Sequence, residues 1–270
     1  MHGLGNDFIF IDGRKSPMNQ ASTLKKAARF LCDRRFGIGA DQILVLGKSK
    51  KADFRMDIYN ADGSQVEMCG NGLRCLARYV KDHQLSNKNE ICVETLTGIQ
   101  VAKILSGSKV MVDMGEPILK AKEIPVKLSG RVINRPIRVD GQEFRATCVS
   151  MGNPHCVIFC DDLKKVPIEK HGSMIEKNHL FPKRTNVEFV KVLSDHEIEM
   201  RVWERGAGET LACGSGACAA VVASVLNSHC DRKVTVKLRG GDLQIEWRRE
   251  DGHVSMTGPA EKVFEGVVEI

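Results

Sequence analysis

Two cysteines in this chain each stand at the start of a glycine turn, and the two stretches are nearly identical. CGNG occupies residues 69–72 and CGSG occupies residues 213–216. The small or apolar residues behind each turn predict a buried helix. Each turn would therefore place a sulfur at a helix N-terminus, where free backbone N–H groups and the helix dipole favour negative charge. A cysteine thiol has a pKa of about 8.5, and this position is expected to lower it by roughly one unit or more.

The same turns are suited to binding an anion. Backbone N–H groups at a helix N-terminus can hold a carboxylate, and glycine lets the ligand approach the backbone closely. Each stretch therefore predicts a thiolate beside a carboxylate site. For one stretch alone, a purely structural interpretation, a packed cysteine beside a glycine turn, explains the sequence equally well, because Cys-Gly-x-Gly is a weak motif.

The sequence around the two cysteines is also repeated. At one spacing of 144 positions, three pairs align: Cys69 with Cys213, Gln42 with Asn186, and FRMDIYN (54–60) with IEMRVWE (198–204). LGNDFIF near the start of the chain resembles MGNPHCVIF further on, which pairs Asn6 with Asn153. Matches in the same order at nearly one spacing indicate an internal duplication.

The duplication predicts the domain organisation. We expect an α+β fold of two pseudo-symmetric halves, each a mainly antiparallel sheet wrapped around a central buried helix. The N-terminal half spans residues 1–115 and is completed by residues 259–270. The C-terminal half spans residues 116–258, with the boundary near the Gly115-Glu116-Pro117 turn.

Local patterns supply the elements of these halves. Helices are expected at Thr23–Asp33, with Ser22 or Thr23 as the N-cap, and behind the cysteines at Gly72–Asp82 and Gly216–Asn227. Stretches that alternate apolar and polar residues predict strands at 7–12, 42–46, 54–59, 91–94, 109–113, 148–149, 156–159, 187–192, 198–203, 234–238, 243–247 and 253–256.

Composition limits the function classes. The chain has 270 residues, of which 42% are hydrophobic and 27% charged, as in ordinary globular proteins. The net charge of +6 is spread along the chain, and without a nucleic-acid-binding signature we expect no nucleic-acid partner. With no apolar leader and no 18-residue apolar stretch, we expect a cytoplasmic protein without a membrane partner.

The ten cysteines do not predict disulfides or a metal site. A chain of this length needs no covalent staples, and the expected compartment keeps thiols reduced. No Cys-x-x-Cys spacing occurs, so we expect no metal. Six cysteines are expected to be small buried apolar residues: Cys32, Cys92, Cys148, Cys156, Cys160 and Cys230.

Two thiols from duplicated halves suggest one specific reaction. If the halves face each other, the thiols stand on opposite sides of one cleft. One thiolate could then remove a proton from a carbon α to a carboxylate, while the other thiol returns a proton to the opposite face. The two helix N-termini would stabilise the charge that develops on the carboxylate. Such an inversion needs no pyridoxal phosphate, and we expect no cofactor.

Polar residues near the predicted strand ends suit an amino-acid substrate. Amides donate and accept hydrogen bonds without adding charge, which fits a zwitterion, although any single Asn is also a common turn residue. These amides are Asn6, Gln42, Asn60, Asn71, Asn153 and Asn186. One addition is asymmetric, because Glu204-Arg205 stands where the first half has Asn60-Ala61. Arg205 could bind a second carboxylate, and Glu204 could hold a second ammonium or tune a thiol.

These motifs together resemble the diaminopimelate epimerase family. The stretches that carry the resemblance run from residue 1 to about residue 265: MHGLGNDF, GADQ, YNADGS, CGNGLRC, MGNPH, TNVEFV, ERGAGETLACGSGAC and MTGPAEKVF. The resemblance implies a two-base epimerase that converts L,L-diaminopimelate to the meso form, in lysine and peptidoglycan precursor synthesis, without pyridoxal phosphate. It also implies two pseudo-symmetric α+β halves and a homodimer.

The resemblance assigns roles to particular residues. Cys69 and Cys213 would be the catalytic pair, and His155 and Glu204 would modulate the two thiols. The substrate would be bound by Asn6, Gln42, Asn60, Gly70, Asn71, Asn153, Asn186, Glu204, Arg205, Gly214 and Ser215. Members of the family carry residues before the MHGLGN motif as part of a first strand. This chain begins on the methionine of the motif, so we expect a shortened edge strand and no lost site residue.

Two alternatives remain open at this stage. The first is another cofactor-independent racemase or isomerase of the same fold, such as a proline-racemase-like protein or a phenazine-biosynthesis-like isomerase. The latter group lacks the cysteine pair, and a monocarboxylic substrate would leave Arg205 without a partner. The second is a binding protein or thiol redox sensor in which Cys69 and Cys213 form a regulatory disulfide.

Overall fold

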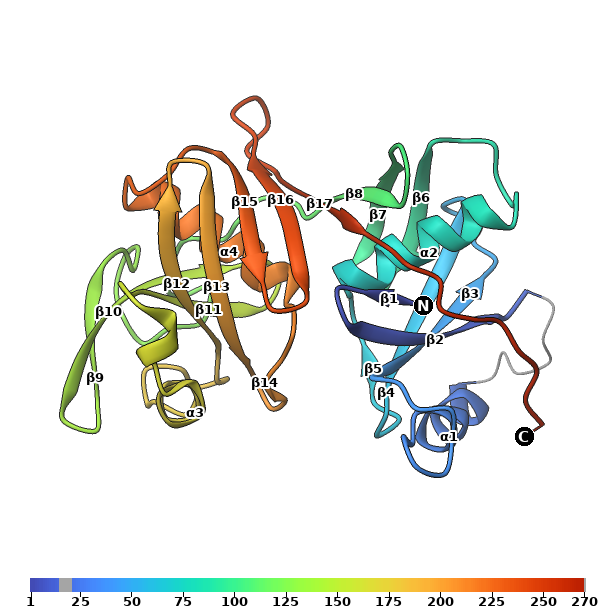
Figure 1. Cartoon of the computed structure of the whole chain (residues 1–270), viewed down its shortest axis with the longest axis horizontal. Helices are drawn as coiled ribbons and strands as arrows, with labels where there is room; N and C mark the ends of the chain where they lie inside the picture. Colours follow the sequence, from blue (N-terminus) through green and yellow to red (C-terminus); the bar gives the residue numbers. More distant parts are fainter. Residues whose placement is uncertain (15–20, 270) are drawn as a thin grey trace. The chain divides into compact units, whose positions relative to one another are not determined.

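The computed structural model describes residues 1–14 and 21–269 and divides into two units. Unit 1 comprises residues 1–113 and the C-terminal segment from Thr257, and unit 2 comprises Met114–Met256 (Figure 1). The chain therefore passes between the units twice. Among the described residues, no helix is long and apolar enough to cross a membrane.

Unit 1 consists of a mixed sheet and two helices. Strands β2 and β3 are parallel, β3 and β4 are antiparallel, β4 and β6 are parallel, and β6, β7 and β8 follow as antiparallel neighbours. The elements are β1 (His2–Gly3), β2 (Asn6–Asp12), α1 (Ala21–Leu31), β3 (Gln42–Gly47), β4 (Phe54–Asn60), β5 (Gln65–Val66), α2 (Gly70–Asp82), β6 (Glu90–Thr95), β7 (Gly98–Ile104) and β8 (Lys109–Asp113).

Unit 2 repeats this plan with additional elements. Strands β11 and β12 are parallel, β12 and β13 are antiparallel, β13 and β15 are parallel, and β15 and β16 are antiparallel. The elements are β9 (Arg135–Val139), β10 (Gln142–Ser150), β11 (Pro154–Phe159), the 3-10 turn η1 (Leu163–Lys165), α3 (Ile168–Glu176), β12 (Asn186–Ser194), β13 (Glu197–Glu204), β14 (Gly208–Glu209), α4 (Gly214–Leu226), β15 (Lys233–Leu238) and β16 (Gly241–Trp247). Strand β17 (Val254–Pro259) leads back to unit 1.

The strand registers reproduce the repeat seen in the sequence. Ile43 pairs with Tyr59 between β3 and β4, and Val187 pairs with Trp203 between β12 and β13. Each residue of the second pair lies 144 positions after its counterpart in the first pair, the same spacing that separates Cys69 from Cys213. The α+β fold with a duplicated unit is therefore confirmed. The sheets are mainly but not wholly antiparallel, because each unit contains two parallel pairings.

The helix behind each cysteine lies in the core of its unit. Helix α4 is buried along most of its length and contacts β10, β11, β12, β13, β15 and β16. Its alanines and glycines let the surrounding strands approach closely, and burial of this apolar surface stabilises the unit by about 25 cal/mol for each Å² removed from water.

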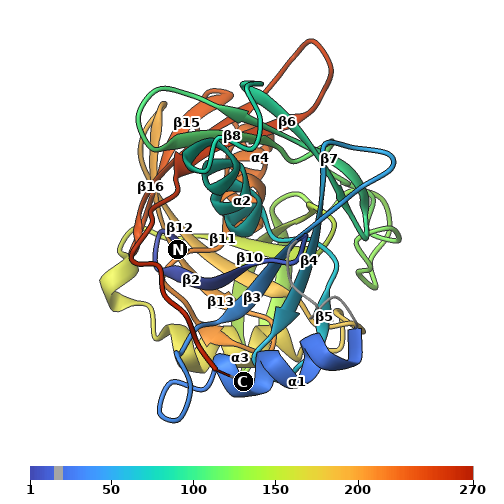
Figure 2. The ribbon, with the colours of Figure 1, turned by 90° about the vertical axis from the view of Figure 1, so that its right-hand side faces the viewer.

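In unit 1, two helices use the two faces of β3. Leu24, Ala28 and Leu31 of α1 cluster with Ile43 and Val45. The first turn of α2 instead packs against Leu44, whose side chain projects from the opposite face of the strand. Figure 2 shows β2, β3 and β4 between the two helices. Helix α2 therefore covers the inner face of the sheet, and α1 covers the outer face.

Some local predictions were wrong. Helix α1 begins at Ala21, so Ser22 and Thr23 lie within its first turn, and the residue before Ala21 is outside the described part of the chain. Strands β7 and β9, the two-residue strands β1, β5 and β14, and helix α3 were missed. Helix α3 has no side-chain hydrogen bond at its N-cap, Pro167, and carries Gly172 in its interior, so it lacks the usual signals of a helix.

Gly172 tests the packing of α3 against β13. A Cβ atom at this position would lie 2.5 Å from Cβ of Trp203. Gly172→Ala should lower the free energy of unfolding by roughly 1–3 kcal/mol in urea titrations, because the helix and the indole must move apart. Ser173→Ala on the same helix is the control and should change it by less than about 0.5 kcal/mol. Equal stability of the two variants would contradict this close contact.

Candidate active site

Cys69 occupies the N-terminal end of α2, as the glycine turn predicted. It is the N-cap residue, with extended backbone angles of φ −142° and ψ 112°, and its carbonyl accepts the first helical hydrogen bond from Leu73. The side chain is half-buried. Its sulfur lies 3.7 Å from Oδ1 of Asn6, an acceptor, so the thiol donates its hydrogen to this oxygen.

Cys213 occupies the equivalent end of α4 but has different neighbours. The backbone N–H of Gly216 donates to its sulfur at 3.4 Å, and the hydroxyl of Ser215 lies 3.6 Å from the sulfur. Burial raises the pKa of the Cys213 thiol well above its usual value, and the carboxyl groups of Glu204 and Glu188 raise it further. The prediction that the helix end lowers this pKa is therefore wrong for Cys213, because desolvation outweighs the donors at the helix N-terminus.

In unit 1, the predicted amides gather beside Cys69. Asn6 donates from Nδ2 to Asp41 at 2.9 Å and accepts at Oδ1 from Nδ2 of Asn71 at 3.2 Å. Because a carboxylate only accepts, Asp41 fixes the orientation of the Asn6 amide and directs its oxygen toward Cys69. Asp41 was missed at the sequence level, although it stands in the GADQ stretch beside Gln42.

A second pair of amides lies beside this group. Gln42 and Asn60 are cross-strand neighbours on β3 and β4, and Nε2 of Gln42 donates to Oδ1 of Asn60 at 2.8 Å. Oε1 of Gln42 and Oδ1 of Asn71 are buried and have no hydrogen-bond partner among the described residues. Buried acceptors without partners are costly, so both oxygens lack a donor that the described residues do not supply.

In unit 2, His155 links to Cys213 through two other predicted site residues. Its Nε2 atom lies 2.9 Å from Oδ1 of Asn153, and Nδ2 of Asn153 donates to the Ser215 hydroxyl at 3.2 Å. The other ring nitrogen of His155 lies 2.7 Å from Oε1 of Glu188. Glu188 was missed at the sequence level.

The asymmetric pair at the end of β13 lies in the same unit. The backbone N–H of Arg205 donates to Oδ1 of Asn186 at 2.8 Å, while its exposed guanidinium donates to the carbonyl of Lys183 at 3.2 Å. Glu204 accepts a hydrogen bond from the hydroxyl of Thr210. Arg205 thus presents a cation at the surface of unit 2, and Glu204 supplies a carboxylate beside it.

The predicted residues therefore form one group in each unit. The unit 1 group contains Cys69, Asn6, Gln42, Asn60, Gly70 and Asn71, and the unit 2 group contains Cys213, Asn153, His155, Asn186, Glu204, Arg205, Gly214 and Ser215. No group of three or more His, Cys, Asp or Glu residues in the described ranges could hold a metal ion.

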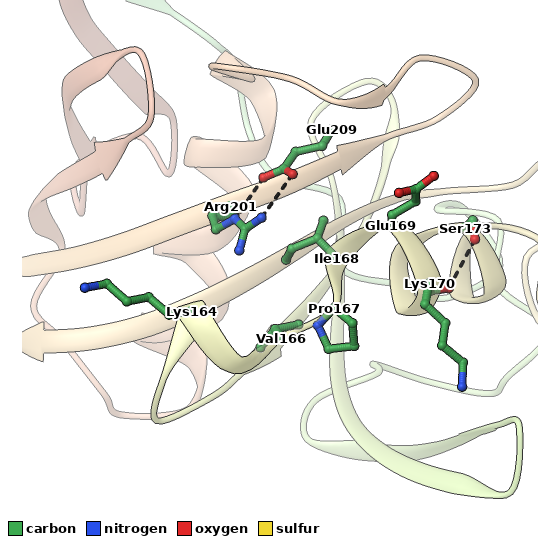
Figure 3. A pocket seen from close by; sticks show the side chains of 9 residues that line it. All are labelled: Lys164, Val166, Pro167, Ile168, Glu169, Lys170, Ser173, Arg201 and Glu209. Atoms are coloured by element: carbon green, nitrogen blue, oxygen red, sulfur yellow. Dashed lines mark hydrogen bonds and ion pairs between the residues drawn. The ribbon is translucent and has the colours of Figure 1, made fainter.

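A surface hollow of about 710 Å³ lies elsewhere on unit 2 and includes none of these residues (Figure 3). It lies between η1, α3 and β13, and its most prominent polar feature is Arg201 bound to both carboxylate oxygens of Glu209 at 2.8 and 3.0 Å. It offers no cysteine or histidine, and Arg201 is already paired. The chemistry of the cysteine groups therefore outweighs the size of this hollow as a guide to function.

Sequence comparisons with known proteins all point to one family, the diaminopimelate epimerases. A sequence model of the diaminopimelate epimerase family matches residues 1–120 and 147–263. A diaminopimelate epimerase from Acetivibrio thermocellus is 51% identical over 275 residues, which cover 100% of this chain and 97% of that protein. One from Desulfitobacterium hafniense is 54% identical over 273 residues, covering 99% of this chain and 96% of that protein.

A solved structure shares the fold at low identity. The phenazine biosynthesis protein of the PhzF family from Bacillus anthracis has a TM-score of 0.69 and 15% identity, covering 99% of this chain and 95% of that chain. At this identity the likeness concerns the fold alone.

Asp41→Ala tests the orientation of the Asn6 amide. Without Asp41, only the hydrogen bond from Nδ2 of Asn71 still orients the Asn6 amide, and when both amides turn over, the N–H₂ group of Asn6 faces Cys69 and stabilises the thiolate. We expect iodoacetamide to alkylate Cys69 about 3–10-fold faster at pH ~7, the effect of roughly 1 kcal/mol from one hydrogen bond. Asp57→Ala, which removes an ion pair with Arg55 on β4, is the control and should leave the rate unchanged. A rate unaltered by Asp41→Ala would show that Asp41 does not set this amide.

Proposed function

This chain belongs to the diaminopimelate epimerase family, and from this premise we propose that it interconverts L,L-diaminopimelate and meso-diaminopimelate without pyridoxal phosphate. It is an isomerase. The observation that carries the site assignment is the placement of Cys69 and Cys213 at equivalent helix N-termini of a duplicated unit. The proposed setting is lysine and peptidoglycan precursor synthesis in the cytoplasm, by a homodimer.

The proposed mechanism uses the two sulfurs as base and acid. One thiolate takes the α-hydrogen of the substrate as a proton, and the thiol of the other cysteine gives its proton to the opposite face of the same carbon. The first cysteine ends as the thiol and the second as the thiolate, so the roles exchange when the reaction runs backwards. The backbone N–H groups of Gly70-Asn71 and Gly214-Ser215 would stabilise the negative charge that develops on the substrate carboxylate.

The hydrogen bonds support a definite starting arrangement. The Cys69 thiol faces an acceptor, Oδ1 of Asn6, which holds its hydrogen. The Cys213 sulfur receives a hydrogen bond from Gly216 and lies beside the Ser215 hydroxyl, which suits negative charge. Burial raises the pKa of Cys213 and makes its thiolate a stronger base toward the poorly acidic α-hydrogen. We propose that Cys213 is the first base and Cys69 the first acid in one direction.

The remaining residues support recognition of a substrate with two charged ends. Oε1 of Gln42 and Oδ1 of Asn71 would accept from the ammonium at the reacting carbon. At the distal end, Arg205 would bind the second carboxylate, and Glu204 would bind the second ammonium. This pair has no counterpart in unit 1, where the aligned residues are Asn60-Ala61.

Substitution of either cysteine tests the two-base mechanism. Cys69→Ser and Cys213→Ser should each lower kcat for epimerisation by at least about 10²–10⁴-fold, because an alcohol neither ionises nor protonates carbon at neutral pH. Chiral chromatography of L,L-diaminopimelate incubated with reduced protein gives the rates, and the wild-type product should gain deuterium at the α-carbon in ²H₂O. Cys92→Ser is the matched control and should keep wild-type activity. Full activity in either catalytic variant would exclude the mechanism.

Arg205→Ala tests recognition of the second carboxylate. A charge-assisted pair contributes roughly 1.5–3 kcal/mol, so kcat/KM for diaminopimelate should fall by about 10–150-fold. Exchange of the α-hydrogen of a monocarboxylic amino acid, measured in ²H₂O, should change far less. Arg239→Ala removes an exposed ion pair with Glu209 in the same unit and is the control. Equal losses on both substrates would argue against a distal carboxylate contact.

A further inference from the structure

A carboxyl group without an assigned role lies beneath the first turn of α4. Glu188 on β12 is fully buried, as is His155, and the two side chains meet at 2.7 Å. Oε2 of Glu188 has no hydrogen-bond partner among the described residues. Burying an ionisable pair costs free energy that its mutual attraction does not always recover. The pair therefore calls for an explanation other than stability.

Unit 1 shows how the same position is filled when no charge is needed. His155 pairs in register with Asn186, and Phe8 pairs with Gln42 at the equivalent place. Two positions further along the second strand of each pair, Glu188 is equivalent to Leu44. Phe8 and Leu44 are both buried. One apolar pair and one ionisable pair thus occupy the same layer of a duplicated fold, so the fold itself does not require the ionisable one.

Both layers lie directly under a catalytic cysteine. A Cβ atom on Gly72 would meet Leu44 at 3.1 Å. A Cβ atom on Gly216 would meet Oε1 of Glu188 at 2.9 Å and the sulfur of Cys213 at 3.2 Å. Glu188 is therefore close enough to influence the charge on that sulfur.

The hydrogen bonds between His155 and Cys213 run in one direction. Oδ1 of Asn153 can only accept, so Nε2 of His155 carries a hydrogen and donates it. Nδ2 of Asn153 donates to the Ser215 oxygen, which leaves the single hydroxyl hydrogen of Ser215 for the sulfur of Cys213. With the N–H of Gly216, the sulfur receives two donors.

This direction depends on a proton held between His155 and Glu188. Since Nε2 already carries a hydrogen, the 2.7 Å contact at Nδ1 needs a second hydrogen on one of the two facing atoms. Burial raises the pKa of Glu188, and the neighbouring Glu204 on β13 raises it further, while His155 on β11 lowers it. Cys156 on β11 and Cys213 on α4 are the other titratable groups close to this carboxyl.

Loss of that proton would reverse the chain of hydrogen bonds. Neutral His155 would then donate from Nδ1 to the carboxylate of Glu188, and Nε2 would become an acceptor. The amide of Asn153 would have to turn over, and its oxygen would take the hydroxyl hydrogen of Ser215. The sulfur of Cys213 would lose one of its two donors.

We propose that Glu188 is a positioning residue for epimerisation: by sharing a proton with His155 it keeps a hydrogen on Nε2 and directs the hydrogen bonds of Asn153 and Ser215 toward the sulfur of Cys213. This inference rests on the proposed function, because it concerns the base of that reaction. It explains why the Phe8 and Leu44 pair of unit 1 is replaced in unit 2.

Two substitutions of Glu188 distinguish an effect on the direction of the hydrogen bonds from an effect of merely filling the space of the side chain. In Glu188→Gln, the amide can still donate to Nδ1 of His155, so the direction of the chain is kept while the movable proton is lost. In Glu188→Leu, no side chain bonds to Nδ1 of His155, so the direction is no longer imposed from this position. The double variant His155→Phe with Glu188→Leu copies the pair found in unit 1, and it provides a folded protein without the chain even if the single leucine variant does not fold.

The first measurement is the pH midpoint of iodoacetamide alkylation at Cys213, followed by peptide mass spectrometry with Cys92 as the internal reference. Glu188→Gln and Glu188→Leu both remove the carboxyl group that raises the pKa of Cys213, so the hydrogen-bond effect is the difference between these two variants. The midpoint in Glu188→Leu and in the double variant should lie about one unit above that in Glu188→Gln, the effect of one lost hydrogen bond to a charged group. Glu246→Gln removes a carboxyl from β16 that is ion-paired to Lys233, and it should cause no shift.

The second measurement is the division of the loss between kcat and KM for diaminopimelate. Glu188→Leu should lower kcat by about 10²-fold and Glu188→Gln by about 10-fold, with KM within about 3-fold of wild type in both. ¹⁵N spectra of the imidazole should show Nε2–H in the wild type and in Glu188→Gln, and a larger share of Nδ1–H in Glu188→Leu.

The proposal would be overturned by equal alkylation midpoints in the glutamine and leucine variants. A loss of activity that merely follows the unfolded fraction, with equal midpoints in these variants, would show a structural role only. These outcomes are distinct from failure of the proposed function, in which wild-type protein would not epimerise diaminopimelate although the alkylation midpoints still differed among the variants.

Discussion

The close approach of a helix N-terminus to a strand of its own sheet governs the placement of both cysteines. At Gly72 and Gly216 the first turn of the helix comes so near the strand that an added Cβ would lie about 3 Å from the side chain below. This contact fixes where α2 and α4 begin, and it thereby places Cys69 and Cys213 as N-cap residues. It also means that whatever side chain lies beneath the turn is within electrostatic reach of the sulfur.

The two units satisfy this constraint with different chemistry. Beneath Cys69 the layer is apolar, and the thiol donates to the oxygen of Asn6, whose amide is held by Asp41. Beneath Cys213 the layer contains an ionisable pair, and the sulfur faces donors from Ser215 and Gly216. In the proposed mechanism, the duplicated fold supplies the symmetry that inversion at carbon requires. The substitutions between the copies would supply the difference in protonation that two sulfurs need before either can act as base or acid.

The sequence predicted the repeated elements well because the repeat itself acted as an internal alignment. The strands around Gln42 and Asn186 and the helices behind both cysteines were found with boundaries within a few residues. Helix α3 was missed, since an interior glycine and an uncapped start hide it from local patterns. Asp41 and Glu188 were missed because their roles depend on hydrogen-bond direction. Glu188 nevertheless left a signal, as a charged residue aligned with Leu44 in an otherwise apolar stretch.

The wrong prediction for Cys213 shows why a local sequence pattern does not determine the pKa of a thiol. A helix N-terminus contributes about 0.3–1 kcal/mol toward the charged form, or about 2 kcal/mol in a partly buried site. Desolvation of a fully buried group shifts a pKa by as much as about 3–5 units in the other direction, so burial prevails. In the proposed mechanism this is useful, because a thiolate of high pKa is a strong base toward a hydrogen on carbon. The donors at the Cys213 sulfur would then limit how rare that thiolate becomes, and the residues that direct those donors would share control of the reaction.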